Sequence, residues 1–325
     1  MEFLKRYQQY GALVERSLAE FIGKTVPRTL YEPAKYILAG GGKRIRPVLM
    51  LCSSEAVGGT KDAALDAAVG LEILHNFTLV HDDIMDNASS RRGRPTVHTK
   101  WDENIAILAG DVLLGLAYRA LLRSNSPHIQ HVSKIFTEGV IEVCEGQAYD
   151  KEFETRRNVT MEDYLLMIRK KTGTMVSVAT EVGGLLGGAS EEERLALKSY
   201  GELVGQAFQV QDDLLDVIAD EEKFGKTIGG DIVEGKKTFL LITALERATG
   251  EDKKLLKGIV ERGGTSRRSV DRVRRIFQST GAIDAAQEQI STDITRAKER
   301  LGLLRRSDAV DMLGWFTDML LNRKS

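Results

Sequence analysis

Two aspartate motifs with the same spacing mark the places where this chain could do chemistry. The first, DDIMD, runs from Asp82 to Asp86 and follows an apolar stretch that predicts the end of a long helix. On a helix, the first and last of these aspartates project from one face, one turn apart, and repel each other unless a cation lies between them. The second motif, DDLLD, runs from Asp212 to Asp216 and again follows an apolar helical stretch.

Carboxylates at this spacing favour Mg²⁺ as their partner. This ion prefers oxygen ligands and typically uses one or two carboxylates together with substrate phosphates. One acidic cluster alone could equally be a solvated helix end. Because the motif recurs, two helices could place both sets of carboxylates around one cavity, and the sequence therefore predicts a metal site. No grouping of Cys and His residues offers a zinc site instead.

Basic side chains gather where glycines interrupt the predicted helices. Such breaks expose backbone N–H groups, which favour phosphate when positive side chains lie beside them. Any one of these cations would usually be a solvated surface group. Because they alternate with the acidic motifs, we expect two anionic groups, one bound through metal and the other by cations alone. The basic residues concerned are Lys43, Arg44, Arg46, Arg91, Arg92, Arg94, Lys170, Lys171, Lys226, Lys236 and Lys237.

The elements that must position these residues are predicted to be helices. Apolar residues recur at helical spacing, strand patterns are scarce, and all five prolines lie at or before Pro127. We therefore predict an all-α fold, with one domain over residues 1–325. Glycines and capping residues such as Ser190 set the boundaries. The expected helices cover 3–22, 29–39, 47–58, 61–86, 102–123, 128–150, 161–186, 190–219, 237–247, 251–262, 267–279, 281–302 and 307–321.

Composition restricts the class of protein further. The chain has 325 residues, of which 42% are hydrophobic, and a formal net charge of −1, so we expect a substantial core and no nucleic-acid partner. No apolar run reaches the roughly 18 residues of a membrane span, and the N-terminus lacks a secretory signal. We expect a cytoplasmic protein without a stable membrane anchor, in which Cys52 and Cys144 are buried thiols.

The motifs also follow the order of a known family. The matching segments are GGGKRIRP at 40–47, HDDIMD at 81–86 with RRGRPTVH at 91–98, KKTG at 170–173, FQVQDDLLD at 208–216 and GKTIGGDIVEGKKT at 225–238. The chain resembles the trans-isoprenyl (polyprenyl) diphosphate synthases of the short-chain, farnesyl or geranylgeranyl type. This resemblance implies an isoprenoid-synthase helical bundle around a deep central cavity, usually as a homodimer.

The resemblance implies a Mg²⁺-dependent prenyl transfer as well, with three ions in each active site. An allylic diphosphate ionises to a carbocation and diphosphate, isopentenyl diphosphate attacks the cation, and a proton is lost. The implied metal ligands are Asp82, Asp86, Asp212 and Asp216. The residues implied in catalysis are Asp82, Asp83, Asp86, Arg91, Lys171, Thr172, Gln209, Asp212, Asp213 and Lys226.

The same resemblance implies the substrate contacts. Those for isopentenyl diphosphate and the allylic diphosphate are Lys43, Arg46, His75, Arg91, Arg92, Lys171, Thr172, Gln209, Lys226 and Lys236. Thr172 and Gln209 match positions beside the developing cation. A lone histidine on a helix is more often a packed core residue, and this alternative applies to His75.

Product length is expected to depend on Phe77. It precedes Asp82 by five residues, which is about 7.5 Å along a helix, and a large aromatic there resembles the plug of short-chain synthases. The alternative is an ordinary core residue, because Thr78 is the residue in register with Asp82. Leu74 would form the next partial stop. We expect farnesyl or geranylgeranyl diphosphate as the product, with the latter slightly favoured.

Other functions remain possible on this fold. A terpene cyclase would share the first acidic motif, but it would not be expected to repeat that motif in the second position. A medium- or long-chain polyprenyl diphosphate synthase would carry the same two motifs. A non-catalytic regulatory subunit is a further alternative, although intact aspartates in both motifs argue against it.

Overall fold

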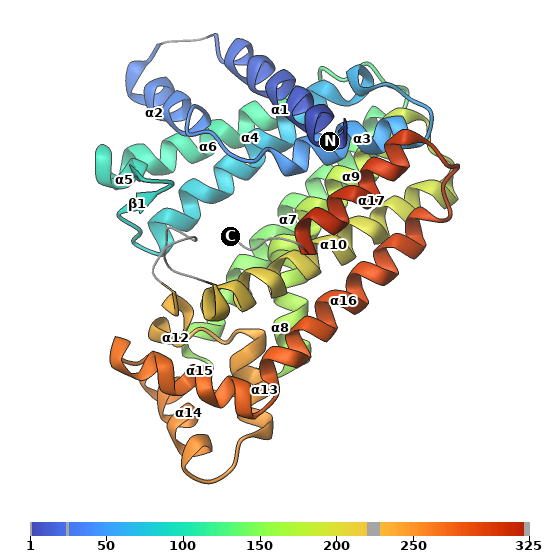
Figure 1. Ribbon diagram of the computed structural model, residues 1–325. Coiled ribbons are helices and arrows are strands. Elements are labelled where there is room, and N and C mark those ends of the chain that lie inside the picture. The colour runs from blue at the N-terminus through green and yellow to red at the C-terminus, as the bar shows by residue number, and fades with distance from the viewer. Residues whose placement is uncertain (1, 24–25, 220–227, 322–325) are drawn as a thin grey trace. The chain divides into compact units, whose positions relative to one another are not determined.

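Helices make up nearly all the regular structure in the computed structural model, which describes residues 2–23, 26–219 and 228–321 (Figure 1). This confirms the predicted all-α fold. Most boundaries lie within a few residues of the predicted ones, as for the predicted helix 281–302, which is α16, Ala282–Leu301. The cap predicted at Ser190 is present: the Glu193 N–H donates to its Oγ at 3.3 Å, and its own N–H donates to a Glu193 carboxylate oxygen at 2.8 Å.

The chain divides into two compact units. Unit 1 comprises Met1–Thr137, Val178–Leu197 and Leu304–Leu313, and unit 2 comprises Glu138–Ser177, Lys198–Leu303 and Gly314–Ser325. The single domain expected over residues 1–325 stays a prediction. Residues of both units occur in α7, Ile129–Thr155, α9, Thr174–Gly187, α10, Glu191–Ile218, and α17, Asp308–Leu321.

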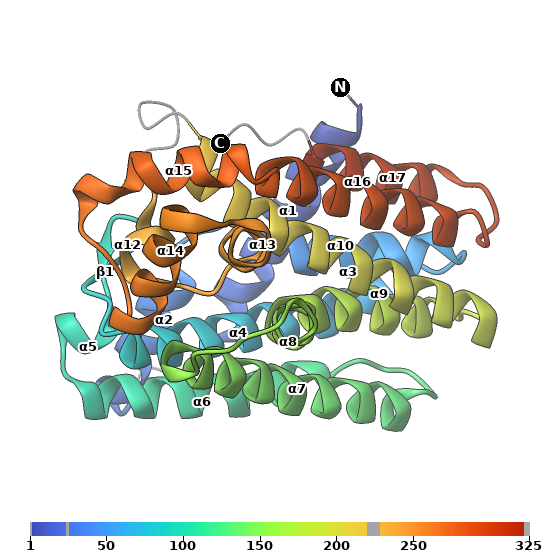
Figure 2. The ribbon, with the colours of Figure 1, turned by 90° about the horizontal axis from the view of Figure 1, so that it is seen from below.

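Unit 1 is built around α4, which packs against α3 and α6 (Figure 2). The contact with α6 is close because Gly70 has no side chain: a Cβ there would lie 2.8 Å from the carbonyl oxygen of Ala117. The helices that lie wholly in this unit are α1, Glu2–Phe21, α2, Arg28–Leu38, α3, Ile45–Ala56, α4, Lys61–Met85, α5, Val97–Lys100, and α6, Glu103–Leu121.

Unit 2 has a core of buried apolar side chains from α13 and the helices around it, including Leu240, Val273, Phe277 and Ala286. The helices that lie wholly in this unit are α8, Met161–Ile168, α12, Gly230–Glu234, α13, Phe239–Arg247, α14, Gly250–Arg262, α15, Val270–Ser279, and α16. A short 3₁₀ turn, Arg267–Ser269, precedes α15. The second aspartate motif lies in the last turns of α10, within this unit.

Two helices are long and apolar enough to cross a membrane by length and composition, which the sequence analysis did not expect. They are α4 and α6. In each helix an 18-residue stretch is apolar enough, and 61% of that stretch in α4 and 44% in α6 is buried inside the protein. In α4 the apolar residues Leu71, Ile73 and Leu74 are at most 1% exposed. Because most of α4 packs against other helices, its hydropathy is that of a core helix in a soluble protein.

Local structure departs from the predictions in several places. Two short helices, α5 and α12, lie where no helix was predicted. A small hairpin pairs β1, Ser90–Arg91, with β2, Arg94–Pro95, and its two-residue turn has positive φ angles of 52° at Arg92 and 71° at Gly93. Such short strands show no alternating pattern in the sequence. The predicted helix 161–186 contains a π-helical turn, Arg169–Gly173. The third helix begins at Ile45 rather than at Pro47, because proline is tolerated in a first helical turn.

One cysteine prediction is also wrong. Cys52 is buried as expected, but Cys144 is exposed. It lies almost one turn after Ile141, which is 47% exposed. An apolar stripe of α7 therefore faces outward, so the apolar pattern around Cys144 did not indicate burial.

The loop that carries the glycine-rich motif is held by Arg44. This side chain is 4% exposed, and its guanidinium donates to Glu15 at 2.7 Å, to the Leu38 carbonyl at 3.0 Å and to the buried carboxylate of Glu72. Burial lowers the pKa of Arg44, but the two carboxylates outweigh this effect and raise it overall. The loop before α3 is thus tied to α1, α2 and α4 by one cation.

Replacing this cation tests the arrangement. Arg44→Met should lower the free energy of unfolding by about 3–5 kcal/mol, because it leaves Glu72 buried without its partner. Glu15 is 43% exposed, so Glu15→Gln should cost no more than about 1 kcal/mol. Urea unfolding followed by circular dichroism measures both. Equal losses of unfolding free energy in the two variants would contradict the larger contribution expected of the buried Arg44–Glu72 pair.

Candidate active site

The first aspartate motif forms the C-terminal end of α4. Asp86 is the C-cap, and its N–H donates to the Asp82 carbonyl at 2.8 Å. Asp86 is exposed and Asp82 is half-buried, whereas Asp83 between them is only 6% exposed. The outer two carboxylates are therefore the ones that solvent can reach, and they lie one helical turn apart as the spacing predicts.

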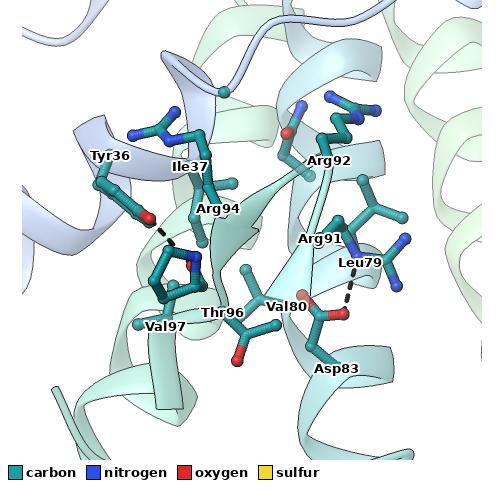
Figure 3. Close-up of a pocket in the computed structure, with 13 residues that line it drawn as sticks. Tyr36, Ile37, Leu79, Val80, Asp83, Arg91, Arg92, Arg94, Thr96 and Val97 are labelled. Atoms are coloured by element: carbon teal, nitrogen blue, oxygen red, sulfur yellow. Dashed lines mark hydrogen bonds and ion pairs between the residues drawn. The ribbon is translucent and has the colours of Figure 1, made fainter. Parts of the chain in front are cut away.

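The inner aspartate of this motif binds an arginine. The Arg91 Nε donates to an Asp83 carboxylate oxygen at 2.7 Å, which joins the hairpin to the end of α4 (Figure 3). Burial raises the pKa of Asp83, and the nearby guanidinium partly offsets this. Two residues that the sequence analysis assigned to catalysis thus contact each other in this structure.

The hairpin is also attached to α2 and to the glycine-rich loop. The Tyr36 hydroxyl donates to the Pro95 carbonyl at 2.9 Å, and the Arg94 guanidinium lies 3.9 Å from the centre of the Tyr36 ring (Figure 3). At the turn, Arg92 Nη1 donates to the Gly41 carbonyl. Arg92 is exposed, so this contact holds a cation at the surface beside the glycines.

A second basic group lies around His75. Its Nε2 is 3.3 Å from Arg46 Nη1. Burial and the nearby arginines, Arg46 first and then Arg92, lower the pKa of His75 well below its ordinary value. The imidazole is therefore neutral at pH 7. Unit 1 brings together Arg46, Arg92 and His75 as predicted, and Lys43 lies exposed on the same glycine-rich loop.

The residues assigned to product length lie on different faces of α4. Phe77 is 8% exposed and packs edge-to-face on His81, with ring centres 4.7 Å apart. A Cβ on Gly110 of α6 would lie 2.2 Å from His81 Nε2, so this pair packs against α6. Gly70, two turns before Phe77 on the same side of α4, lies against the α6 backbone. The Thr78 hydroxyl donates to the His75 carbonyl at 2.8 Å, and Leu74 is 1% exposed.

In unit 2, the KKTG motif forms the π-helical turn. A Cβ on Gly146 of α7 would lie 2.3 Å from the Lys171 nitrogen, and one on Gly205 of α10 would lie 2.6 Å from the Gly173 Cα. Both neighbouring helices therefore approach this turn through glycine. Lys171 Nζ donates to Asp150 at 2.6 Å, so the cation assigned to the leaving group already has a carboxylate partner.

A chain of hydrogen bonds links this turn to the second aspartate motif. Thr172 Oγ1 donates to Gln209 Oε1 at 2.9 Å, and Gln209 Nε2 donates to Asp213 Oδ1 at 3.0 Å. The Tyr164 hydroxyl donates to the other Asp213 oxygen at 2.6 Å. Burial, with a smaller effect from Asp231, raises the pKa of Asp213 to about 7. The structure thus brings together Thr172, Gln209 and Asp213.

The last aspartate of this motif caps a short helix. Asp216 accepts hydrogen bonds from the Gly230 and Asp231 N–H groups at 3.3 and 3.1 Å, at the start of α12. Its pKa is raised by burial and lowered by these bonds, with a net rise. This contact was not predicted from the spacing. Asp212, one turn earlier, is half-buried.

Sequence reasoning missed several polar partners. Burial raises the pKa of Asp231 to about 6 although Lys236 Nζ lies 3.5 Å away. In the sequence, Asp231 is marked only as an acidic residue that follows two glycines. Asp150 and Tyr164 gave no signal, since their partners are distant in the sequence. Lys226 lies outside the described residues, so its predicted role stays a prediction.

The donor set fits Mg²⁺. In unit 1, Asp82 and Asp86 are not fully buried, and in unit 2 the same is true of Asp212. Carboxylates are ligands that Mg²⁺ prefers. Among the described residues, no group of three or more His, Cys, Asp or Glu side chains is placed to bind a metal by itself. Mg²⁺ commonly binds through one or two carboxylates, with phosphate oxygens and water as further ligands.

Comparison with known proteins identifies the family. The polyprenyl synthetase family matches residues 27–277. The chain is 41% identical to the short chain isoprenyl diphosphate synthase of Methanothermobacter thermautotrophicus and 39% identical to the geranylgeranyl diphosphate synthase of Methanosarcina mazei, covering 100% of this chain and 99% of each relative. A crystal structure of geranylgeranyl pyrophosphate synthetase from Pyrococcus horikoshii matches with a TM-score of 0.94 and 41% identity, covering 99% of this chain and 98% of that chain. This chain therefore belongs to the polyprenyl synthetase family.

Proposed function

We propose that this chain is a Mg²⁺-dependent trans-prenyltransferase that condenses isopentenyl diphosphate with allylic diphosphates. The product would be a short all-trans prenyl diphosphate, with geranylgeranyl diphosphate favoured over farnesyl diphosphate. The observation that carries this proposal is the identity of 41% along the whole chain with a short-chain isoprenyl diphosphate synthase. The placement of cations and carboxylates within each unit supports it.

Ionisation of the allylic substrate requires charge to be neutralised on the departing diphosphate. Three bound Mg²⁺ ions would supply most of the positive charge that neutralises the diphosphate. Asp82, Asp86 and Asp212 would hold these ions, with Asp216 as a further ligand. Lys171 and Arg91 would bind the same diphosphate, together with Lys226. In this structure Lys171 pairs with Asp150 and Arg91 pairs with Asp83. On binding, each cation would replace its carboxylate partner by phosphate oxygens, with little movement of the side chain.

The second diphosphate needs a site that works without metal. Lys43, Arg46 and Arg92 would bind the diphosphate of isopentenyl diphosphate, and Lys236 is a further candidate. His75 lies against Arg46 as a neutral imidazole, so it would donate an N–H group to the anion. Cations fixed in advance by the glycine-rich loop and the hairpin lower the cost of ordering them on binding.

The allylic cation must be stabilised and kept from water. Thr172 and Gln209 present oxygen atoms joined by a hydrogen bond, and their dipoles would lie beside the developing charge. Oriented dipoles stabilise charge best where they need no rearrangement during the reaction. The π electrons of isopentenyl diphosphate then form the new C–C bond, and loss of a proton restores the double bond.

We also propose a cytoplasmic homodimer. Ile107 and Leu108 on α6 are 40% and 51% exposed, and the neighbouring Gly115 is open to solvent. Large exposed apolar side chains are typical of a surface that pairs with another chain, although the exposed Asp111 lies between them and Gly115.

The aspartates can be tested against a matched control. Asp82→Asn and Asp212→Asn should each lower kcat by at least about 100-fold, because each removes a charge that holds Mg²⁺ and the departing diphosphate. Asp62→Asn, an exposed change in the first turn of α4, should leave turnover unchanged. Radiolabelled isopentenyl diphosphate incorporation, with and without EDTA, measures this. Near-normal turnover of either site variant at saturating Mg²⁺ would refute the assignment.

The two sets of cations should differ in their kinetic effects. Arg92→Ala and Lys43→Ala should raise the KM for isopentenyl diphosphate more than that for the allylic substrate, because they act on one diphosphate. Lys171→Ala should mainly lower kcat, because it acts on ionisation. Lys170→Ala is the matched control, since Lys170 pairs with Glu145 instead. One common kinetic pattern for all the site variants would contradict this division.

Phe77→Ala should lengthen the product, because it removes the ring that limits the space for the growing chain, with Leu74 as the next partial stop. Phe136→Ala, which removes another buried ring of unit 1, controls for general loosening of the core. Chromatography of dephosphorylated products at identical substrate ratios measures the lengths. An unchanged distribution, or a wild type that already makes much longer chains, would exclude the plug.

A further inference from the structure

The buried carboxylate of Asp213 accepts hydrogen bonds from three parts of unit 2. It is 5% exposed. One oxygen accepts from the Tyr164 hydroxyl of α8 at 2.6 Å and from the Phe239 N–H of α13 at 3.4 Å. The other oxygen accepts from the Gln209 amide, one turn earlier in α10, at 3.0 Å. In this arrangement all three groups donate, and Asp213 accepts on both oxygens.

This arrangement fixes the direction of the next hydrogen bond. A glutamine amide has one donor end and one acceptor end. Since Gln209 Nε2 donates to Asp213, its Oε1 must face Thr172, and it accepts from the Thr172 hydroxyl at 2.9 Å. Thr172 is only 8% exposed. The orientation of two polar groups is thus set by a carboxylate that touches only one of them.

The surroundings of Asp213 make it a rigid support. Tyr164 is 1% exposed, and its ring packs edge-to-face on Phe239 with centres 6.2 Å apart. Successive residues of an α-helix point about 100° apart, so Asp213 does not share a direction with its half-buried neighbour Asp212. The two adjacent aspartates of the motif therefore have different surroundings, one polar cluster in the protein interior and one region open to solvent.

We propose that Asp213 is a positioning residue that fixes the direction of the Thr172–Gln209 hydrogen bond, and that it is not a metal ligand. This inference rests on the proposed function, in which the oxygens of Thr172 and Gln209 lie beside the allylic cation. Reversing the bond would turn an N–H group toward the place where an oxygen now lies. A cation is stabilised by the first arrangement and opposed by the second.

The substitution Asp213→Asn creates this reversal with little change in shape. The new amide oxygen would take the Tyr164 and Phe239 donors, which leaves the new NH₂ group facing the NH₂ group of Gln209. Because the Phe239 N–H can only donate, it should hold the new amide oxygen on its side. The glutamine should then flip and donate to Thr172. Adding Gln209→Glu places a carboxylate between Thr172 and the new amide. This carboxylate accepts from both and restores the original direction, with the same net charge as the wild type.

The experiment compares the wild type with Asp213→Asn, Gln209→Glu, the double variant and Asp212→Asn. We expect Asp213→Asn to lower kcat about 10- to 100-fold, with KM for both diphosphates and the Mg²⁺ concentration for half-maximal activity nearly unchanged. The double variant should regain most of the lost kcat. Asp212→Asn, as the reference for a metal ligand, should instead raise the Mg²⁺ requirement.

Two results would overturn the proposal: a Mg²⁺ requirement raised by Asp213→Asn as it is by Asp212→Asn, or a double variant slower than both single ones. If Asp213→Asn fails to fold, the double variant decides, since a Mg²⁺ requirement raised as in Asp212→Asn would overturn the proposal. A wild type without condensation activity would refute the proposed function instead. The orientation is then tested alone by urea unfolding, where a double variant no more stable than Asp213→Asn would refute it.

Discussion

A carboxylate that is taken out of water must accept hydrogen bonds from fixed donors, and both aspartate motifs are built on this requirement. The inner aspartates, Asp83 and Asp213, are 6% and 5% exposed. One accepts from a guanidinium of the following hairpin, and the other from a tyrosine, a glutamine and a backbone N–H. In each unit, the aspartate that precedes this buried group is only half-buried.

The predicted cations of the site are held in a comparable way before any substrate is present. Arg91 and Lys171 each lie within ion-pair distance of one carboxylate, and Arg92 rests on a backbone carbonyl. Such contacts keep long side chains in place and reduce the entropy lost when an anion binds. Arg46 lies against His75, whose lowered pKa avoids placing a second positive charge beside it. Arg91, Lys171 and Arg92 are thus held in place without the deep burial that would favour their neutral forms.

Periodicity predicted the helices well, and motif spacing predicted the one-turn separation of Asp82 and Asp86, because both depend on neighbours within a few turns. Helix 61–86 differs from α4 by one residue. What could not be predicted depends on partners distant in the sequence. Asp150 beside Lys171, Tyr164 beside Asp213 and the cap that Asp216 makes on α12 all join segments that only folding brings together. The burial of Cys144 was also predicted wrongly, because an apolar stripe of a helix can face solvent.

The π-helical turn at Arg169–Gly173 has a consequence for how this region can vary. A π turn holds one more residue than an α turn, so the chain before it is rotated relative to the chain after it. Removing a single residue there would restore a regular helix, but it would turn Lys171 and Thr172 away from Asp150 and Gln209. Gly146 and Gly205 leave no room to compensate, because a Cβ on either would lie within 2.6 Å of the turn. The segment should therefore tolerate side-chain exchange far better than any change in its length.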